Sequence, residues 1–206
     1  MNTVVWDVDD VLNDLMHSWF ELHWLPRHPD CPITYSMISE NPPHLLLGVS
    51  VTEYLASLDT FRLSEAAREM APVPEVLGWF RSHGGHFRHI ALTATPMCAA
   101  PFSAAWVMRH FGWWIRSFSI VPSVRAGEVA PIYDNSKQDF LRWWGKADIL
   151  VDDNAMNIAA AQELGISTVL IPRPWNGSQL TLADALETLA GFAGKEETSR
   201  SRRRSL

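Results

Sequence analysis

Short apolar runs alternate with helical patterns between residues 86 and 172, and this alternation limits the fold more than any other feature of the sequence. The runs HFRHIALTAT, FSIVP, ADILVDD and STVLIP are typical of strands, and the stretches between them have the apolar spacing of helices. Helices that connect successive strands form right-handed crossovers, which leave the strands parallel and the helices on both faces. The sequence therefore predicts an α/β fold with an open, three-layer, Rossmann-like parallel sheet.

A further strand is expected near the start of the chain, where TVVWDV occupies residues 3–8. Helical patterns and a proline-rich loop at residues 26–43 separate this strand from the alternating region. The first helical pattern begins at Val11, and the apolar residues on its face are Leu12, Leu15, Trp19 and Leu22. Shorter helical patterns follow at residues 51–58 and 63–70.

The most economical organisation is a single core interrupted by an insertion. Residues 1–13 and 72–193 would form the core, and residues 14–71 would form a small helical cap inserted after the first strand. Within the core, a helix is expected over residues 72–85, ending at Gly84 and Gly85 in the manner of a glycine C-cap.

The composition is that of a chain that packs rather than one that stays solvated. Hydrophobic residues make up 47% of the 206 residues and charged residues 19%. Cys31 and Cys98 lie far apart and form no CxxC pair, which favours a reduced, cytoplasmic setting over a disulfide framework. Residues 1–20 lack the pattern of a signal peptide, and no apolar run approaches the ~18 residues of a membrane span. We therefore expect no membrane association.

Residues 194–206 differ from the rest of the chain. The protein carries a net charge of −6, yet this segment ends in RSRRRSL. It has no apolar periodicity, so we expect it to be a disordered, solvated tail. A basic arm can bind nucleic acid, but nothing else in the sequence supports that partner, and we do not expect it.

Polar side chains occur where several of the expected elements meet the same edge of the sheet. In open α/β sheets, ligands bind outside the carboxyl ends of the strands. The residues that would converge there are Asp7, Asp9, Thr93, Thr95, Lys137, Asp152 and Asp153. Their carboxylates, with no histidine or cysteine among them, form the hard oxygen site that Mg²⁺ prefers. A divalent cation would relieve the repulsion among these carboxylates and, together with lysine and hydroxyl groups, would suit a phosphate dianion.

Four short motifs resemble, in order, those of the haloacid dehalogenase superfamily of phosphohydrolases. They are DVDDVL at the first strand, LTAT at the end of the second, the helix-start Lys137, and LVDD. Together they span the whole core. A finer resemblance, to the 5'(3')-deoxyribonucleotidases, rests on Asp14, the proline of TATP, the helix AWVMRHFG and PWN at residues 174–176. Asp10 stands where those relatives commonly have glycine.

The resemblance implies roles for the acidic residues that match its motifs. Asp7 would be the nucleophile that forms an aspartyl phosphate. Asp9 would be the general acid for the leaving group and then the base for water. Mg²⁺ would be held by Asp7, the backbone carbonyl of Asp9, and Asp152, with Asp153 in support.

The resemblance also implies that Lys137 and a hydroxyl group bind the phosphate, by positioning and charge stabilisation. Strand phase favours Thr93 as the hydroxyl. Alignment on Pro96 puts Ala94 at that place instead and leaves Thr95 as the nearby hydroxyl. Both alternatives stay open, and all three residues are candidates for substrate binding.

Several of these residues also have a structural interpretation. Asp10 and Asp153 could be helix N-caps, and for Asp10 we favour the cap. Lys137 could be a solvated lysine, although a lysine at a helix start opposes the macrodipole, and Thr93 could be a strand former at a strand end. The histidines of HGGHFRH, residues 83–89, are expected in a solvated loop rather than on a metal.

The cap contains aromatic side chains that could recognise a base. Trp19, Phe20, Trp24 and Tyr35 could stack on a nucleobase, whereas a tryptophan at helical spacing more often packs in a core. We take Trp19 and Phe20 as the candidate substrate-binding aromatics.

The leading hypothesis is a Mg²⁺-dependent phosphomonoesterase for a small phosphorylated metabolite, with a nucleoside monophosphate as the best single substrate. A cap that closes over the sheet edge favours substrates small enough to be enclosed. One alternative is a phosphatase for a sugar phosphate or a biosynthetic intermediate. Another, of a different class, is a non-catalytic binding module whose basic tail docks nucleic acid. A dimer is compatible with the sequence, which carries no signal for the oligomeric state or for 5' versus 3' preference.

Overall fold

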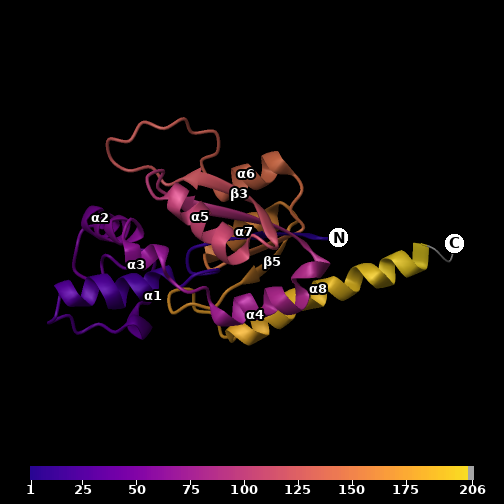
Figure 1. The fold of residues 1–206 in the computed structure, drawn as a ribbon, viewed down its shortest axis with the longest axis horizontal. Helices are drawn as coiled ribbons and strands as arrows, with labels where there is room; N and C mark the ends of the chain where they lie inside the picture. Colours follow the sequence, from indigo (N-terminus) through magenta and orange to yellow (C-terminus); the bar gives the residue numbers. More distant parts are fainter. Residues whose placement is uncertain (204–206) are drawn as a thin grey trace.

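A five-stranded parallel sheet forms the centre of the protein in a computed structural model that describes residues 1–203, without side chains from residue 194 onward (Figure 1). The strands are β1 (Thr3–Trp6), β2 (Arg88–Thr95), β3 (Ile115–Pro122), β4 (Ile149–Asp152) and β5 (Ser167–Leu170). Their spatial order is β3-β2-β1-β4-β5, and every neighbouring pair is parallel. Trp6 pairs with Ala91 of β2 and Val151 of β4. The carboxyl end of β1 therefore lies between those of β2 and β4.

Helices cover both faces of this sheet, as the alternation predicted. One face packs against α4 (Pro74–His83), α5 (Ala100–Phe111) and α8 (Leu182–Arg203), and the other against α6 (Lys137–Trp144) and α7 (Ala155–Glu163). Successive side chains of β1 point to opposite faces: Val4 and Trp6 belong to the first hydrophobic cluster and Val5 to the second. The predicted three-layer α/β fold is confirmed.

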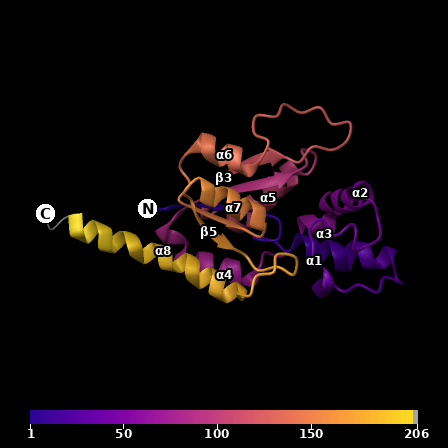
Figure 2. The same ribbon diagram turned by 180° about the vertical axis from the view of Figure 1, so that it is seen from behind.

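The chain between β1 and α4 forms a helical insertion at the carboxyl end of the sheet (Figures 1 and 2). Its elements are α1 (Leu15–Trp19), a π-helix (Phe20–Trp24), 3-10 turns (Leu25–Arg27 and Tyr35–Met37), α2 (Val51–Arg62) and α3 (Glu65–Arg68). These elements enclose a third hydrophobic cluster that includes Trp19, Tyr54 and Phe61. The insertion thus has a hydrophobic core of its own, beyond the carboxyl ends of the strands (Figure 1).

The first helix differs from its prediction in two ways. It begins at Leu15 rather than Val11, and it continues as a π-helix, so Phe20, His23 and Trp24 are buried while Leu22 is 60% exposed. The regular 3.6-residue pattern put Leu22 on the buried face. A π-helix has wider turns, which rotates the following residues relative to that pattern.

Helix α4 ends at the predicted glycines, with Gly84 as its C-cap, but without the left-handed conformation of a glycine cap. Gly84 has a φ of −57° and starts a 3-10 turn (Gly84–His86) instead of adopting a left-handed conformation. A Cβ added at Gly84 would lie 2.8 Å from the indole of Trp114, whereas one added at Gly85 would meet nothing within 4 Å. Gly84 is therefore required by close packing and not by backbone conformation.

Helix α8 continues to Arg203, past the point at which the sequence loses its apolar periodicity. The side chains from residue 194 and all of residues 204–206 lie outside the described part, so the disordered basic tail stays a prediction. Among the described helices, none combines the length and hydropathy that crossing a bilayer requires.

Candidate active site

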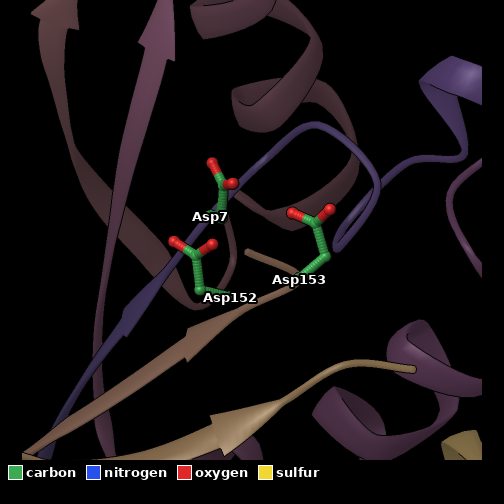
Figure 3. Close-up of side chains that lie close together, drawn as sticks. All are labelled: Asp7, Asp152 and Asp153. Carbon is green, nitrogen blue, oxygen red and sulfur yellow. The ribbon is translucent and has the colours of Figure 1, made fainter. Parts of the chain in front are cut away.

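Three buried carboxylates meet at the carboxyl ends of two neighbouring strands. Asp7 directly follows β1, Asp152 is the last residue of β4, and Asp153 follows it. One oxygen from each lies within 4.8 Å of the others. Figure 3 shows the three side chains converging from β1 and β4 on one small space. The carboxylates of Asp7, Asp152 and Asp153 are therefore close enough to repel one another when ionised.

Lys137 lies directly against this cluster. It is the first residue of α6, whose N-cap Ser136 accepts a hydrogen bond from the amide of Asp139. The ammonium nitrogen of Lys137 lies 2.8 Å from Oδ2 of Asp7 and 2.7 Å from Oδ2 of Asp152. With only 4% of its surface exposed, Lys137 is not a solvated lysine. Three carboxylates and one ammonium leave a formal charge of −2 at the site.

The pKa values at the site follow from this arrangement. Burial raises the pKa of Asp7 well above its ordinary value, Lys137 opposes the rise, and Asp152 adds to it. Burial, followed by the charge of Asp152, raises the pKa of Asp153 to about 6. Burial alone would lower the pKa of Lys137, but the charges of Asp152 and Asp7 outweigh it and raise that pKa. Carboxylates that are costly to ionise here would gain from a further positive charge.

The donor set fits a hard divalent cation, because every candidate ligand atom is an oxygen. Asp153 and Asp7 line a cavity of about 350 Å³, and Asp152 does not. The carboxylate of Asp152 instead accepts hydrogen bonds from Lys137, the amide of Asn154 and the side chain of Asn157. One oxygen of Asp153 accepts a 2.8 Å bond from the indole of Trp175. Asp153 therefore faces the cavity, and Asp152 orients Lys137.

Asp9 belongs to the same loop but contacts other partners. Its Oδ2 lies 3.0 Å from Nη2 of Arg62, and its Oδ1 accepts a 3.2 Å bond from Asn13. Asp9 lines the cavity beside Asp7, yet it is not one of the three clustered carboxylates. Its side chain is thus turned toward the insertion.

The structure separates the two hydroxyl candidates of the second strand. Thr93 and Thr95 are both 1% exposed, but only Thr93 and the exposed Ala94 line the cavity of Asp7. The Oγ1 atom of Thr93 is buried and has no hydrogen-bond partner among the described residues. An unpartnered hydroxyl at the cavity wall is suited to bind an anionic ligand, which favours Thr93 over Thr95.

Of the two predicted helix caps, Asp10 caps a helix and Asp153 does not. Asp10, with a left-handed φ of 60°, accepts a 2.8 Å bond from the amide of Met16 in the first turn of α1. Asp14, at the N-cap position, makes no such bond, so Asp10 caps the helix from a distance. For α7, Asn154 is the N-cap, and Asp153 is not.

The candidate base-stacking residues do not reach the cavity. Trp19 and Phe20 are both 0% exposed and lie inside the hydrophobic cluster of the insertion, so their proposed contact with substrate is wrong. Trp24 is buried and stacks on His28, while Tyr35 packs against His17 and Trp175. Core packing explains all four rings.

One histidine of the predicted solvated loop is buried. His89 lies in β2, where its Nδ1 accepts a bond from the indole of Trp6 and its Nε2 lies 2.8 Å from the carbonyl oxygen of Gly84. Burial lowers the pKa of His89 to about 4. The segment HGGHFRH overlaps the strand expected over HFRHIALTAT, and the structure assigns His89 to that strand, which starts at Arg88.

The opposite wall of the cavity comes from the insertion and was not predicted from the sequence. One face of α2 contributes Val51, Tyr54, Leu55, Leu58 and Arg62. Arg125, from the connection between β3 and α6, lies at the same cavity. Val51, Leu55, Leu58 and Arg62 follow one another at intervals of three or four residues, and Tyr54 adjoins Leu55, as on one helix face. Nothing in the sequence tells whether that face is turned toward the site.

The architecture and the positions of these residues can be compared with known proteins. No family model and no curated protein matches the sequence. Solved structures do match over almost the whole chain. A haloacid dehalogenase-like hydrolase from Streptococcus pneumoniae is 14% identical with a TM-score of 0.59, covering 93% of this chain and 98% of that chain. The chain has the haloacid dehalogenase-like fold.

Other structures with this fold carry different descriptions. A predicted phosphatase from Clostridium acetobutylicum is 15% identical, with a TM-score of 0.56 and coverage of 89% of this chain and 90% of that chain. Protein tyrosine kinase A of Mycobacterium tuberculosis is 14% identical, with a TM-score of 0.58 and coverage of 92% and 98%. At such identities the likeness shows the haloacid dehalogenase-like fold alone, so the chemistry has to be argued from the site.

Proposed function

We propose that this haloacid dehalogenase-like protein is a phosphomonoesterase that transfers the phosphoryl group of a small substrate first to Asp7 and then to water. The observation that carries this proposal is the contact of Asp7 with Lys137 beside Asp153, at a cavity of about 350 Å³. A nucleophilic carboxylate, an ammonium group and a site for a divalent cation are the parts that phosphoryl transfer requires.

In the first step, a carboxylate oxygen of Asp7 attacks phosphorus. The bond between phosphorus and the ester oxygen breaks, and the leaving oxygen takes a proton from the carboxyl group of Asp9. Lys137 offsets the charge of Asp7 and of the phosphate, and the hydroxyl of Thr93 donates to a phosphoryl oxygen. The products are an alcohol and an aspartyl phosphate.

In the second step, water attacks the same phosphorus atom and gives a proton to Asp9, which is now ionised. The bond between phosphorus and Asp7 breaks, and the carboxylate is restored together with inorganic phosphate. Asp9 is thus the group that moves both protons.

A divalent cation, Mg²⁺ by its preference for oxygen ligands, would be held by Asp7 and Asp153, with the backbone carbonyl of Asp9 as the third ligand suggested by the sequence motif. Bound there, it would supply positive charge to the phosphoryl oxygens. Asp152, which does not line the cavity, would support the site through Lys137 and Asn157.

The cavity walls bear on the substrate. The wall formed by α2 is apolar at Val51, Leu55 and Leu58, which suits the flat faces of a base better than a fully hydroxylated sugar. A nucleoside monophosphate is therefore our first candidate. A sugar phosphate is the second, because the amides of Asn154 and Asn157 also line the cavity and can bind hydroxyl groups.

The test is phosphate release from nucleoside monophosphates, sugar phosphates and p-nitrophenyl phosphate, each with Mg²⁺ and with EDTA. The wild type, Asp7→Asn and the surface variant Asp139→Asn would be compared. Metal-dependent release that Asp7→Asn loses and Asp139→Asn keeps is the expected result. Equal release by Asp7→Asn and the wild type would refute the proposal.

A further inference from the structure

Four charged side chains form a continuous ion-pair chain at the cavity, running Asp9, Arg62, Asp59, Arg125. Asp9 Oδ2 lies 3.0 Å from Nη2 of Arg62, and Nη1 of the same arginine lies 2.9 Å from Oδ1 of Asp59. Asp59 also accepts two bonds from Arg125, through Nε and Nη2. The side chains are only 12 to 19% exposed. Pairs this enclosed are screened much less than surface pairs.

The chain of contacts crosses between the core and the insertion twice. Asp9 follows β1 in the core, Arg62 and Asp59 lie one turn apart near the end of α2, and Arg125 lies on the connection between β3 and α6. In both views this connection extends over the same end of the sheet as α2 (Figures 1 and 2). The ion pairs therefore join α2 to the core at two points, Asp9 and Arg125.

The contacts of Asp59 differ from those of its neighbours. Asp9, Arg62 and Arg125 line the cavity, whereas Asp59 does not. Both carboxylate oxygens of Asp59 accept hydrogen bonds from Arg62 and Arg125. Asp59 can therefore affect a ligand in the cavity only through these two arginines. Arg125 is fixed further by bonds from Nη1 to the carbonyl and hydroxyl oxygens of Ser123.

We propose that Arg62 is a positioning residue for Asp9, and that Asp59 with Arg125 holds Arg62 in place, so that proton transfer requires α2 to be seated on the core. This inference rests on the proposed function. A carboxyl group that gives a proton in one step and takes one in the next needs a fixed orientation toward the reacting oxygen. The bond from Arg62 fixes Oδ2 of Asp9, and the only other side chain bonded to that carboxylate in the described structure is Asn13.

The experiment compares two esters with different leaving groups. The p-nitrophenolate ion leaves readily without a proton, whereas the alkoxide of a nucleoside 5'-monophosphate needs one. The value of kcat/KM, which reports the steps through the first phosphoryl transfer, would be measured on both esters. The variants are Arg62→Met, Arg62→Lys, Asp59→Asn, Asp9→Asn and the double variant Asp9→Asn with Arg62→Met.

We expect Arg62→Met to lower kcat/KM for the nucleotide by about 10-fold to 100-fold, part of the ~100-fold or more that a general acid contributes. The loss for p-nitrophenyl phosphate should be several times smaller. Asp59→Asn should show the same leaving-group dependence with a smaller loss, and Arg62→Lys should recover part of the rate, since lysine keeps the charge but lacks the planar fork. Added to Asp9→Asn, Arg62→Met should cause no further loss.

Arg142→Met is the matched control. Arg142 makes the same type of pair, with Asp139 one turn earlier in α6, but it is 57% exposed. This variant should leave both esters unaffected. Equal losses on the two esters, or losses that multiply with Asp9→Asn, would overturn the role of Arg62 while leaving the phosphatase intact. A wild type that releases phosphate from neither ester would overturn the proposed function and this inference together.

Discussion

The ammonium nitrogen of Lys137 lies 2.8 Å from Oδ2 of Asp7, and neither side chain is more than 11% exposed. Replacing Lys137 by methionine keeps most of the unbranched side chain but removes the ammonium group and its charge. Asp7 and Asp152 would then lack their buried counterion, which we expect to cost about 3 to 5 kcal/mol of folding free energy. Phosphate release should fall by about 100-fold or more, since a transition-state charge partner is lost.

Urea unfolding and phosphate release test this prediction together. Lys146→Met, which removes an exposed lysine just after α6, is the control. A variant of Lys137 that is as active and as stable as the wild type would show that the ion pair does not matter.

Binding of Mg²⁺ should stabilise the folded protein, because the site has a formal charge of −2 without it. At ligand concentrations about 100-fold above Kd, the gain in unfolding free energy is about 2.7 kcal/mol. We expect the melting temperature to rise with Mg²⁺ in the wild type and in Asp139→Asn, and to be insensitive to Mg²⁺ in Asp153→Asn. If Mg²⁺ raises the melting temperature of the Asp153→Asn variant as much as that of the wild type, Asp153 is not a ligand of the metal.

His89 predicts a specific dependence of stability on pH. Its pKa is lowered from 6.5 to about 4 in the fold, so between these values the unfolded chain takes up a proton that the folded chain refuses. Stability should therefore fall as the pH drops from about 6.5 to about 4, by at most ~3 kcal/mol from this group. Unfolding free energies of the wild type and His89→Gln across this range would test it. The prediction fails if both proteins show the same slope.

Gly84 and Gly85 form a matched pair for a packing test. A Cβ at Gly84 would lie 2.8 Å from the Trp114 ring, and one at Gly85 has open space. We expect Gly84→Ala to destabilise the protein by about 1 to 3 kcal/mol and Gly85→Ala to change stability by less than about 1 kcal/mol. Equal unfolding midpoints for the two variants would rule out the packing requirement at Gly84.

The sequence predicted the parts of the fold that follow from local periodicity. Alternating strands and helices specified the parallel sheet, and strand ends specified that Asp7, Thr93 and Asp153 would meet. These predictions succeed because the carboxyl ends of parallel strands share one edge of the sheet.

Other features depend on packing between distant segments and left no local signal. The π-helix after Trp19 turned Leu22 outward, so a pattern based on 3.6 residues per turn misassigned Leu22. Arg62 lies 53 residues from Asp9, and its partner could be found only when α2 was placed on the sheet. The different roles of Asp152 and Asp153 could be assigned only once the cavity was located, because Asp153 lines it and Asp152 does not.

In the proposed reaction, Asp7 carries the phosphoryl group between the two steps. Asp9→Asn should slow hydrolysis of the aspartyl phosphate, because the base for water is lost. We would mix this variant with Mg²⁺ and p-nitrophenyl phosphate, quench in acid within seconds, and measure the intact mass and the modified peptide. We expect one added phosphoryl group, on Asp7, and none when Asp7→Asn is combined with Asp9→Asn. A phosphoryl group on another residue, or full phosphate release by Asp7→Asn alone, would contradict it.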